Sequence, residues 1–200
     1  MSTMQLKELF LDGAQLNWKL IDAIEEFKRL KEVPQSKQWH KEGNVYNHTK
    51  LVVNEMDGQM DILGIDFDSD YYRLMIGAAL CHDLGKYGTT YFSEEVGDYK
   101  CKNHGAESEK ITRELFKDEE SAILELLCSM VRWHMDLHHV LNVDNPELKI
   151  KKLIAKCSAP IDDMIILNYC DSKGSINDNS EDDIVNRINA INQYILNIKK

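Results

Sequence analysis

The residues best suited to chemistry in this sequence are His82 and Asp83, which lie side by side in the stretch Gly-Ala-Ala-Leu-Cys-His-Asp-Leu-Gly-Lys at positions 77–86. The small and apolar residues before them predict a buried helix, in which adjacent residues point about 100° apart. Both side chains can therefore reach one point only near a helix end or across a cleft. An imidazole nitrogen beside a carboxylate oxygen is a ligand pair suited to Zn, Mn, Fe, Ni or Co. Gly85 permits a turn and Lys86 adds a cation, as a phosphate-handling site would require.

Taken alone, a His-Asp pair is weak evidence for a metal site, because an ordinary helix end can carry a neutral histidine and an exposed aspartate. Further candidate ligands stand at or near predicted helix ends or loop junctions: His48, His104, His134, His138 and Asp171. For His104 and His134 the spacing leaves open whether they bind metal or only pack. His40, His138 and His139 are expected to lie at the surface or to support the ligands rather than act directly.

The sequence offers few other sites. The segment from His134 to His138 has the histidine spacing of the metalloprotease motif His-Glu-x-x-His, but Met135 replaces the glutamate that would act as general base. No Gly-rich phosphate loop or Gly-x-Ser-x-Gly motif occurs. Trp39 and Trp133 flank histidines and are candidates for a pocket wall.

Composition limits the class of protein. The chain has 200 residues, of which 43% are hydrophobic and 29% charged, enough for one domain with a sizeable core. The net charge of −10 argues against a broad surface for duplex nucleic acid, which needs clustered cations. Five scattered cysteines, the absence of an apolar N-terminal segment and the shortness of the apolar runs together predict a cytosolic protein without membrane contact.

Apolar periodicity predicts an all-α fold. One or two amphipathic helices are expected over residues 6–31, bent near Gly13, and another helix beginning near Val45 carries His48. Further helices are expected over 71–82, 105–116, 119–133, 148–157, 161–171 and 182–197. Ser69 and Asp70 are candidate N-cap residues after a connection at 58–70. Residues 85–103 predict a long loop, and no strand pattern is evident.

These residues also carry a family resemblance. His48, the pair His82-Asp83, and Asp171 resemble the H…HD…D signature of the HD superfamily of metal-dependent phosphohydrolases. The match is most similar to the HD domain of bacterial CCA-adding tRNA nucleotidyltransferases. It rests on Trp-His-Lys-Glu-Gly-Asn-Val-Tyr-Asn-His at 39–48, on the stretch 78–90, on His104-Gly-Ala-Glu-Ser, on Arg-Trp-His134 and on Asp171-Ser-Lys-Gly. It covers about residues 38–175. Lys41 stands where a proline is usual and Gly105 where an acidic residue is usual, and no nucleotidyltransferase head is present.

The resemblance implies a single HD-domain helical bundle over 1–200, with extra terminal helices at 1–32 and 182–200. These extensions would serve as structural caps or as a homodimer interface. It also implies that His48, His82, Asp83 and Asp171 bind a divalent metal (Mn, Ni, Co, Fe or Zn, with Mg less suited to the imidazole ligands), which activates water to attack phosphorus. The catalytic residues would be Asp83, Lys86, His104 and His134; the two histidines either stabilise or protonate the leaving group or bind a second metal.

The implied substrate is a small nucleotide or phosphoester, such as a 2′,3′-cyclic phosphate, a 2′-nucleotide or a phosphomonoester. Two alternatives stay open from the sequence. The ligand set also resembles that of two-metal HD hydrolases that cleave dinucleoside tetraphosphates. The second alternative is a non-catalytic module that binds a nucleotide as a sensor. Such a module has no need to keep every ligand position.

Overall fold

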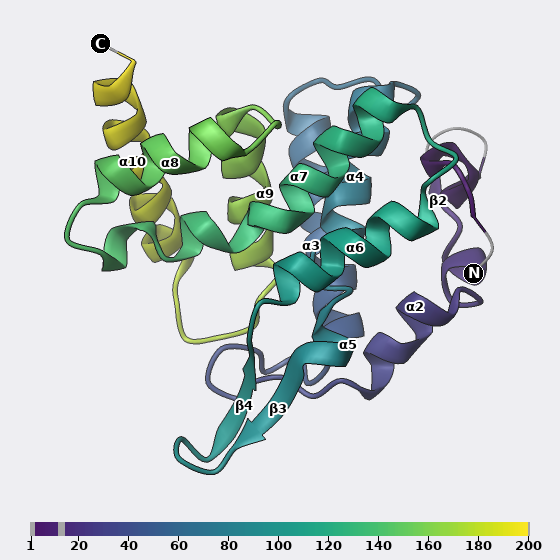
Figure 1. Cartoon of the computed structure of the whole chain (residues 1–200), viewed down its shortest axis with the longest axis horizontal. Helices are drawn as coiled ribbons and strands as arrows, with labels where there is room; N and C mark the ends of the chain where they lie inside the picture. The colour runs from purple at the N-terminus through teal and green to yellow at the C-terminus, as the bar shows by residue number, and fades with distance from the viewer. Residues whose placement is uncertain (1–2, 12–14, 200) are drawn as a thin grey trace.

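The computed structural model describes residues 3–11 and 15–199, which form a bundle of α-helices (Figure 1). The helices that make up most of the core are α3 (Val45–Ile62), α4 (Asp70–Cys81), α6 (His104–Leu115), α7 (Ser121–His138) and α9 (Ile161–Lys173). The predicted all-α fold is confirmed.

Helix α4 lies at the centre of the bundle. It begins after Ser69, whose hydroxyl accepts a hydrogen bond from the Tyr72 amide, as the N-cap prediction required. From Leu74 to Cys81 every side chain is buried, and the helix packs against α3, α7 and α9. This all-round apolar surface is typical of a helix enclosed by others, and it carries the chain directly to His82 and Asp83.

Helices α8 (Pro146–Lys156) and α10 (Glu181–Ile198) pack against each other at the end of the molecule opposite the N-terminal segment (Figure 1). A short 3₁₀ turn, η3 (Val140–Asn142), joins α7 to α8. Helix α10 also packs against α9, so the C-terminal extension contacts one of the core helices.

The prediction of one or two long helices over residues 6–31 is wrong. This segment consists of short elements: η1 (Leu6–Leu9), β1 (Phe10–Leu11), β2 (Gln15–Leu16), α1 (Trp18–Ile21), α2 (Glu25–Lys28) and η2 (Arg29–Glu32). Successive single turns bury Leu6 and Leu9, and later Phe27 and Leu30, each pair three residues apart as on one face of a helix. The bend expected at Gly13 lies outside the described residues.

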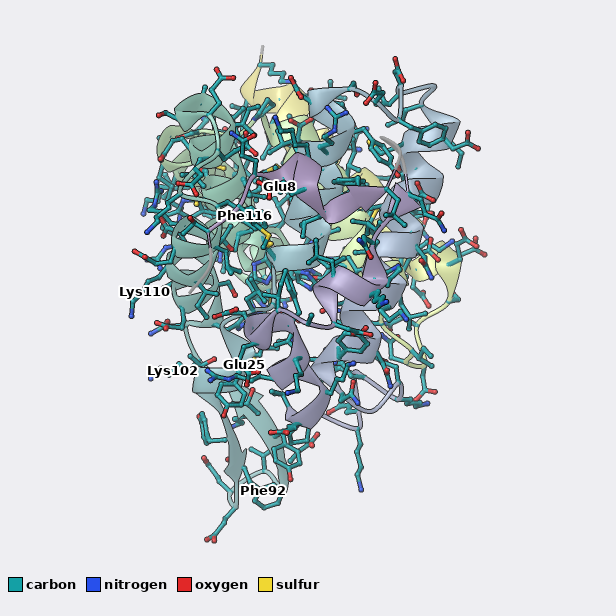
Figure 2. The ribbon with its side chains drawn as sticks, turned by 90° about the vertical axis from the view of Figure 1, so that its right-hand side faces the viewer. Glu8, Glu25, Phe92, Lys102, Lys110 and Phe116 are labelled. Carbon is teal, nitrogen blue, oxygen red and sulfur yellow. The ribbon has the colours of Figure 1, made fainter. Side chains whose placement is uncertain are left out.

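The prediction of a loop over residues 85–103 is also wrong. It holds α5 (Lys86–Thr89) and an antiparallel hairpin of β3 (Thr90–Ser93) and β4 (Asp98–Cys101), in which Thr90 lies opposite Cys101. Figure 2 shows Phe92 on this hairpin, well away from the helices. Tyr91 and Phe92 are both about half exposed, so neither face of the hairpin is buried and the sequence lacks strand alternation.

The largest differences from the expected helix boundaries are at the C-terminal ends of α3 and α7. Helix α3 continues through Gly58 to Ile62, and α7 continues five residues past Trp133 to His138. The longer α7 matters for the site because it places His134 and His138 one turn apart on the same helix. Among the described residues, no helix is both long and apolar enough to cross a membrane.

Candidate metal centre

The end of α4 positions the His-Asp pair. The His82 amide still bonds to the Ala78 carbonyl at 3.0 Å, and Nδ1 of its ring donates to the Ala79 carbonyl at 2.8 Å. This bond leaves Nε2 of His82 free as an acceptor, 3.3 Å from Oδ2 of Asp83. His82 and Asp83 thus lie at the C-terminal end of α4, where, as expected, two adjacent side chains can reach one point.

Two further helices bring ligands to the same point. His48 lies on α3 and Asp171 on α9, and His48 Nε2 is 2.9 Å from Asp171 Oδ1. The Nε2 atoms of His48 and His82 are 3.3 Å apart. All four side chains are buried. The structure thus brings together the four predicted metal ligands, although they come from three helices and span more than a hundred residues of the sequence.

A second group forms on the other side of the Asp83 carboxylate. Oδ1 of Asp83 lies 3.3 Å from Nε2 of His104, which in turn lies 3.1 Å from Nε2 of His134. Nδ1 of His134 donates to the Val131 carbonyl at 2.7 Å. The two oxygens of Asp83 therefore face two different sets of imidazoles, and each set could hold a metal ion.

Close helix contacts make this geometry possible. A Cβ atom at Gly105 would lie 2.6 Å from the Arg132 carbonyl oxygen, so only glycine lets α6 approach α7 where His104 meets His134. A Cβ atom at Gly85 would lie 2.3 Å from the His104 carbonyl oxygen. Gly85 has a helical φ of −71°, so its role is close packing against α6 rather than the turn that the sequence suggested.

The donor set fits a divalent cation. Neither oxygen of Asp83 accepts a well-aligned hydrogen bond from the described residues, although the carboxylate is almost fully buried. His48 and His82 direct Nε2 toward each other and toward the carboxylates, an arrangement that needs either a proton or a metal ion between these basic atoms. Mixed imidazole and carboxylate ligands suit first-row transition metals.

Charges in the protein compensate one another in the absence of metal. Burial would raise the pKa of Asp83, but the charge of Lys86 and the neighbouring His82 hold it well below its usual value. Burial would lower the pKa of His48, yet hydrogen bonds to Asp171 and Glu42 raise it to about 9. Burial lowers the pKa of His104 to about 4, so this ring is neutral and able to bind a metal near pH 7.

Glu42 also belongs to the site, although no role is predicted for it from the sequence. Its side chain is 2% exposed, and Oε1 lies 2.8 Å from Nδ1 of His40 and 3.2 Å from Nδ1 of His48. Oε2 accepts the Ile176 amide at 3.0 Å. A carboxylate on Nδ1 fixes the ring of a histidine ligand and raises its basicity. In the sequence Glu42 stood out only as part of the stretch 39–48 that resembles the HD family, in a loop without periodicity.

Two of the three remaining histidines contact the candidate ligands. His138 Nε2 lies 2.8 Å from Oδ2 of Asp171 and so holds the oxygen that faces away from His48. His40 stacks edge-on against His48, with ring centroids 4.7 Å apart. His139 lines the cavity that opens over these residues.

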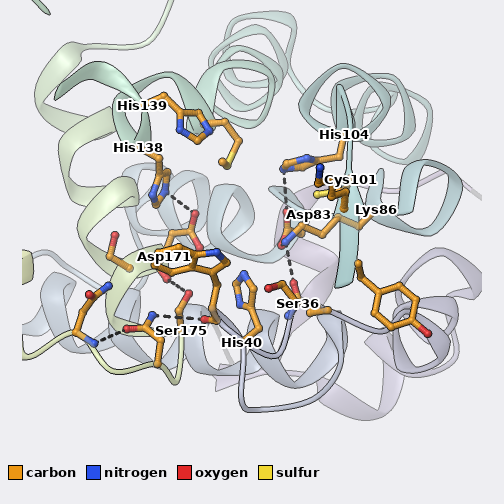
Figure 3. Close-up of a pocket in the computed structure, with 18 of the residues that line it drawn as sticks. Ser36, His40, Asp83, Lys86, Cys101, His104, His138, His139, Asp171 and Ser175 are labelled. Carbon is orange, nitrogen blue, oxygen red and sulfur yellow. Dashed lines mark hydrogen bonds and ion pairs between the residues drawn. The ribbon is translucent and has the colours of Figure 1, made fainter. Parts of the chain in front are cut away.

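A cavity of about 550 Å³ opens over these groups (Figure 3). His104, Asp83, Lys86 and Cys101 gather on one side of it, and His138, His139 and Asp171 on the other. Trp39, about half exposed, contributes to the wall as expected. Trp133 does not, because its ring packs beneath Lys156, whose ammonium lies 3.7 Å from the ring centroid.

Lys86 is buried at the rim of this arrangement. Its ammonium lies 2.7 Å from Oδ2 of Asp83 and donates to Oε1 of Gln35 at 2.8 Å. Burial would lower the pKa of Lys86, but the charge of Asp83 raises it, so the side chain is a permanent cation.

Comparison with known families agrees with this geometry. The HD domain family matches residues 45–159, more than half of the chain. The chain therefore belongs to the HD domain family, a family of metal-dependent phosphohydrolases whose members bind divalent metals. The match includes His48, His82, Asp83, His104 and His134, and it ends before Asp171. A comparison with curated proteins gave no match.

Proposed function

We propose that the protein is a phosphohydrolase that hydrolyses nucleotides or nucleotide-like phosphoesters with a metal-activated water. The observation that carries the proposal is the buried cluster of His48, His82 and Asp171, with Asp83 Oδ2 3.3 Å from His82 Nε2, beneath an open cavity that Asp83 and Asp171 line. A divalent metal bound there would acidify water and polarise a phosphoryl oxygen. Family membership supports the reaction class, and the cavity volume suits a nucleotide-sized ligand.

The protein's own residues would orient the substrate and manage its charge. Lys86 lines the cavity and would attract the phosphoryl oxygens while it holds Asp83 as an anion. His104 also faces the cavity, and its neutral imidazole would donate to the phosphoryl group or exchange a proton with the leaving oxygen. The neighbouring His134, whose Nδ1 proton is bonded to the Val131 carbonyl, would accept a proton from His104 through Nε2. Trp39 would stack against a base.

A nucleotide panel tests the proposal. It contains 2′,3′-cyclic, 2′- and 3′-monophosphates, deoxynucleotides and dinucleoside tetraphosphates, each assayed with Mn, Ni, Co or Mg. We expect turnover of at least one substrate and its loss, together with the bound metal, in Asp83→Ala. A fully active Asp83→Ala protein would contradict the assignment of the site.

A second candidate is a two-metal dinucleoside tetraphosphate hydrolase. The observation in its favour is that Asp83 Oδ1 faces His104 and His134 while Oδ2 faces His82. In that case His134→Ala should remove one equivalent of metal, measured by elemental analysis, and leave the other. An unchanged metal content would leave these two histidines as proton donors beside a single ion.

The non-catalytic alternative predicts metal or nucleotide binding without turnover of any panel substrate. The similarity to the HD domain of CCA-adding enzymes is retained as part of the proposal, since it points toward nucleotides and RNA ends. The single HD domain over residues 1–200, the cytosolic location and the homodimer remain predictions.

A further inference from the structure

Arg187 is a cation that the proposed hydrolysis has not used. It is the only Lys or Arg between Lys173 and Lys199, in a segment rich in Asp and Asn. It lies on α10, outside the residues that match the HD family. Asp183, Ile184 and Arg187 occupy one face of α10, and all three line the cavity above the candidate metal centre.

The guanidinium group of Arg187 is held in place but its charge is not matched. It donates to the hydroxyl of Ser172, which itself donates to the Asn168 carbonyl at 2.7 Å. Across residues 3–11 and 15–199, no carboxylate forms an ion pair with Arg187 and no other hydrogen bond to it occurs. Most of its five N–H donors are thus left for solvent or a ligand.

The two acidic side chains nearest in the cavity wall are already engaged. Asp171 contacts His48 and His138, each through one oxygen. Asp183 accepts from the amide and hydroxyl of Ser180 at the start of α10. Burial lowers the pKa of Arg187, and the charge of Asp171 only partly offsets this cost. A partly buried cation of this kind is stabilised by a bound anion.

The position of Arg187 indicates what kind of anion it would bind. Ser172 follows Asp171 directly on α9, so the guanidinium is fixed close to the metal centre but on the α10 side of the cavity. Lys86 and His104 lie on the opposite side, near the hairpin. A volume of about 550 Å³ exceeds the needs of a single phosphate group. A cation on each side of the centre suits a substrate with two linked anionic groups.

We propose that Arg187 binds a second phosphoryl group of the substrate, separate from the one at the metal centre, and so selects nucleotides with two or more phosphates over monophosphates. This inference rests on the proposed function, since it assumes that the first phosphoryl group lies at His48, His82, Asp83 and Asp171. A guanidinium group is suited to the role because it donates two parallel hydrogen bonds to phosphate.

The test compares AMP with ADP, which differ by one phosphoryl group. Dissociation constants are measured by calorimetry with excess Mn, and hydrolysis is followed separately as KM and kcat. Arg187→Gln removes the charge and keeps a polar side chain with an N–H donor. Lys199→Gln makes the same charge change at the far end of α10, where the lysine is exposed and lies 3.8 Å from Asp162. Far-UV circular dichroism checks the fold, and Arg187→Lys replaces the glutamine variant if that variant does not fold.

We expect the wild type and Lys199→Gln to bind ADP more tightly than AMP. Arg187→Gln should weaken ADP binding and raise its KM by about tenfold, the loss of one charged hydrogen-bond pair, with little change for AMP. Equal effects on both nucleotides, no effect on either, or no binding of ADP by the wild type would overturn the inference. If ADP selectivity depends on Arg187 but no substrate in the panel is hydrolysed, the proposed function fails while this assignment stands.

Discussion

The ammonium nitrogen of Lys86 lies 2.7 Å from Oδ2 of Asp83, and both side chains are buried. Three residues apart in the chain, they form an ion pair at the rim of the candidate metal centre. Lys86 thus supplies positive charge to the shared carboxylate when no metal is bound.

The first prediction follows from this pair. Lys86→Met leaves the Asp83 carboxylate buried without its cation, which should lower the free energy of unfolding of the metal-free protein by about 3 kcal/mol. Saturating Mn should recover part of the loss, because a bound divalent ion replaces the missing charge. Urea titrations with EDTA and with Mn measure both effects. Lys152→Met, at an exposed position on α8, is the control and should change little.

The second prediction concerns Glu42, which holds Nδ1 of His48 at 3.2 Å. Glu42→Gln keeps the shape of the side chain but removes the charge that orients and strengthens this ligand. Metal affinity should fall by about 10–100-fold, measured by competition with a chromophoric chelator. Glu95→Gln, in the exposed turn of the hairpin, should bind metal like the wild type. Unaltered affinity in Glu42→Gln would limit Glu42 to tethering its loop to Ile176.

The sequence was most informative where chemistry and helix ends coincide. His82, Asp83 and Asp171 stand out because polar residues at the ends of apolar helices are unexpected unless they serve a site. The resemblance to the HD family adds His48 and implies that the four bind one metal. Glu42 and Arg187 gave no such signal: one lies in an irregular loop, and the other is a single cation on an amphipathic helix. Their roles depend on which distant segments meet, and this is set by tertiary packing.

The same distinction explains the errors in secondary structure. The hairpin of β3 and β4 exposes both Tyr91 and Phe92, so neither of its faces is buried. Its sequence therefore lacks the alternation of apolar and polar residues that marks a half-buried strand. In the N-terminal segment, Leu6, Leu9 and Phe27 are buried as a helical pattern would require. Separate short turns satisfy that requirement equally well, and apolar spacing alone does not distinguish them from one long helix.

The third prediction is a pH dependence of stability. The Tyr71 hydroxyl on α4 donates to Oδ1 of Asp163 on α9 at 2.8 Å. Burial raises the pKa of Asp163, and the hydrogen bond from Tyr71 only partly opposes it. The folded state therefore binds this proton more tightly than the unfolded state does. The contribution of Asp163 to stability falls as pH rises from about 3.9, the unfolded value, through the raised folded value.

Asp163→Asn cannot titrate, so its stability relative to wild type should improve as pH rises from about 4 to about 7. Urea denaturation of the two proteins across this range measures the difference. Tyr71→Phe, with Asp163 unchanged, removes the hydroxyl donor and should make stability fall more steeply as pH rises. A difference between Asp163→Asn and wild type that is constant or shrinks with pH would contradict the raised pKa.

The fourth prediction uses two glycines in helices. Gly105→Ala would place Cβ 2.6 Å from the backbone oxygen of Arg132, which cannot move aside as a side chain could. Helices α6 and α7 must then separate, which should cost about 1–3 kcal/mol of stability. His104 and His134 move apart with them, so binding of a metal by this pair should weaken.

Gly58→Ala is the matched control because nothing lies within 4 Å of its added Cβ on the exposed side of α3. There the replacement should stabilise the protein by about 0.5–1 kcal/mol, since alanine loses less backbone entropy in a helix. Thermal melts of both variants, with and without metal, give the comparison. If Gly105→Ala were as stable as Gly58→Ala and kept its metal content, the contact between α6 and α7 would not be what positions His104 against His134.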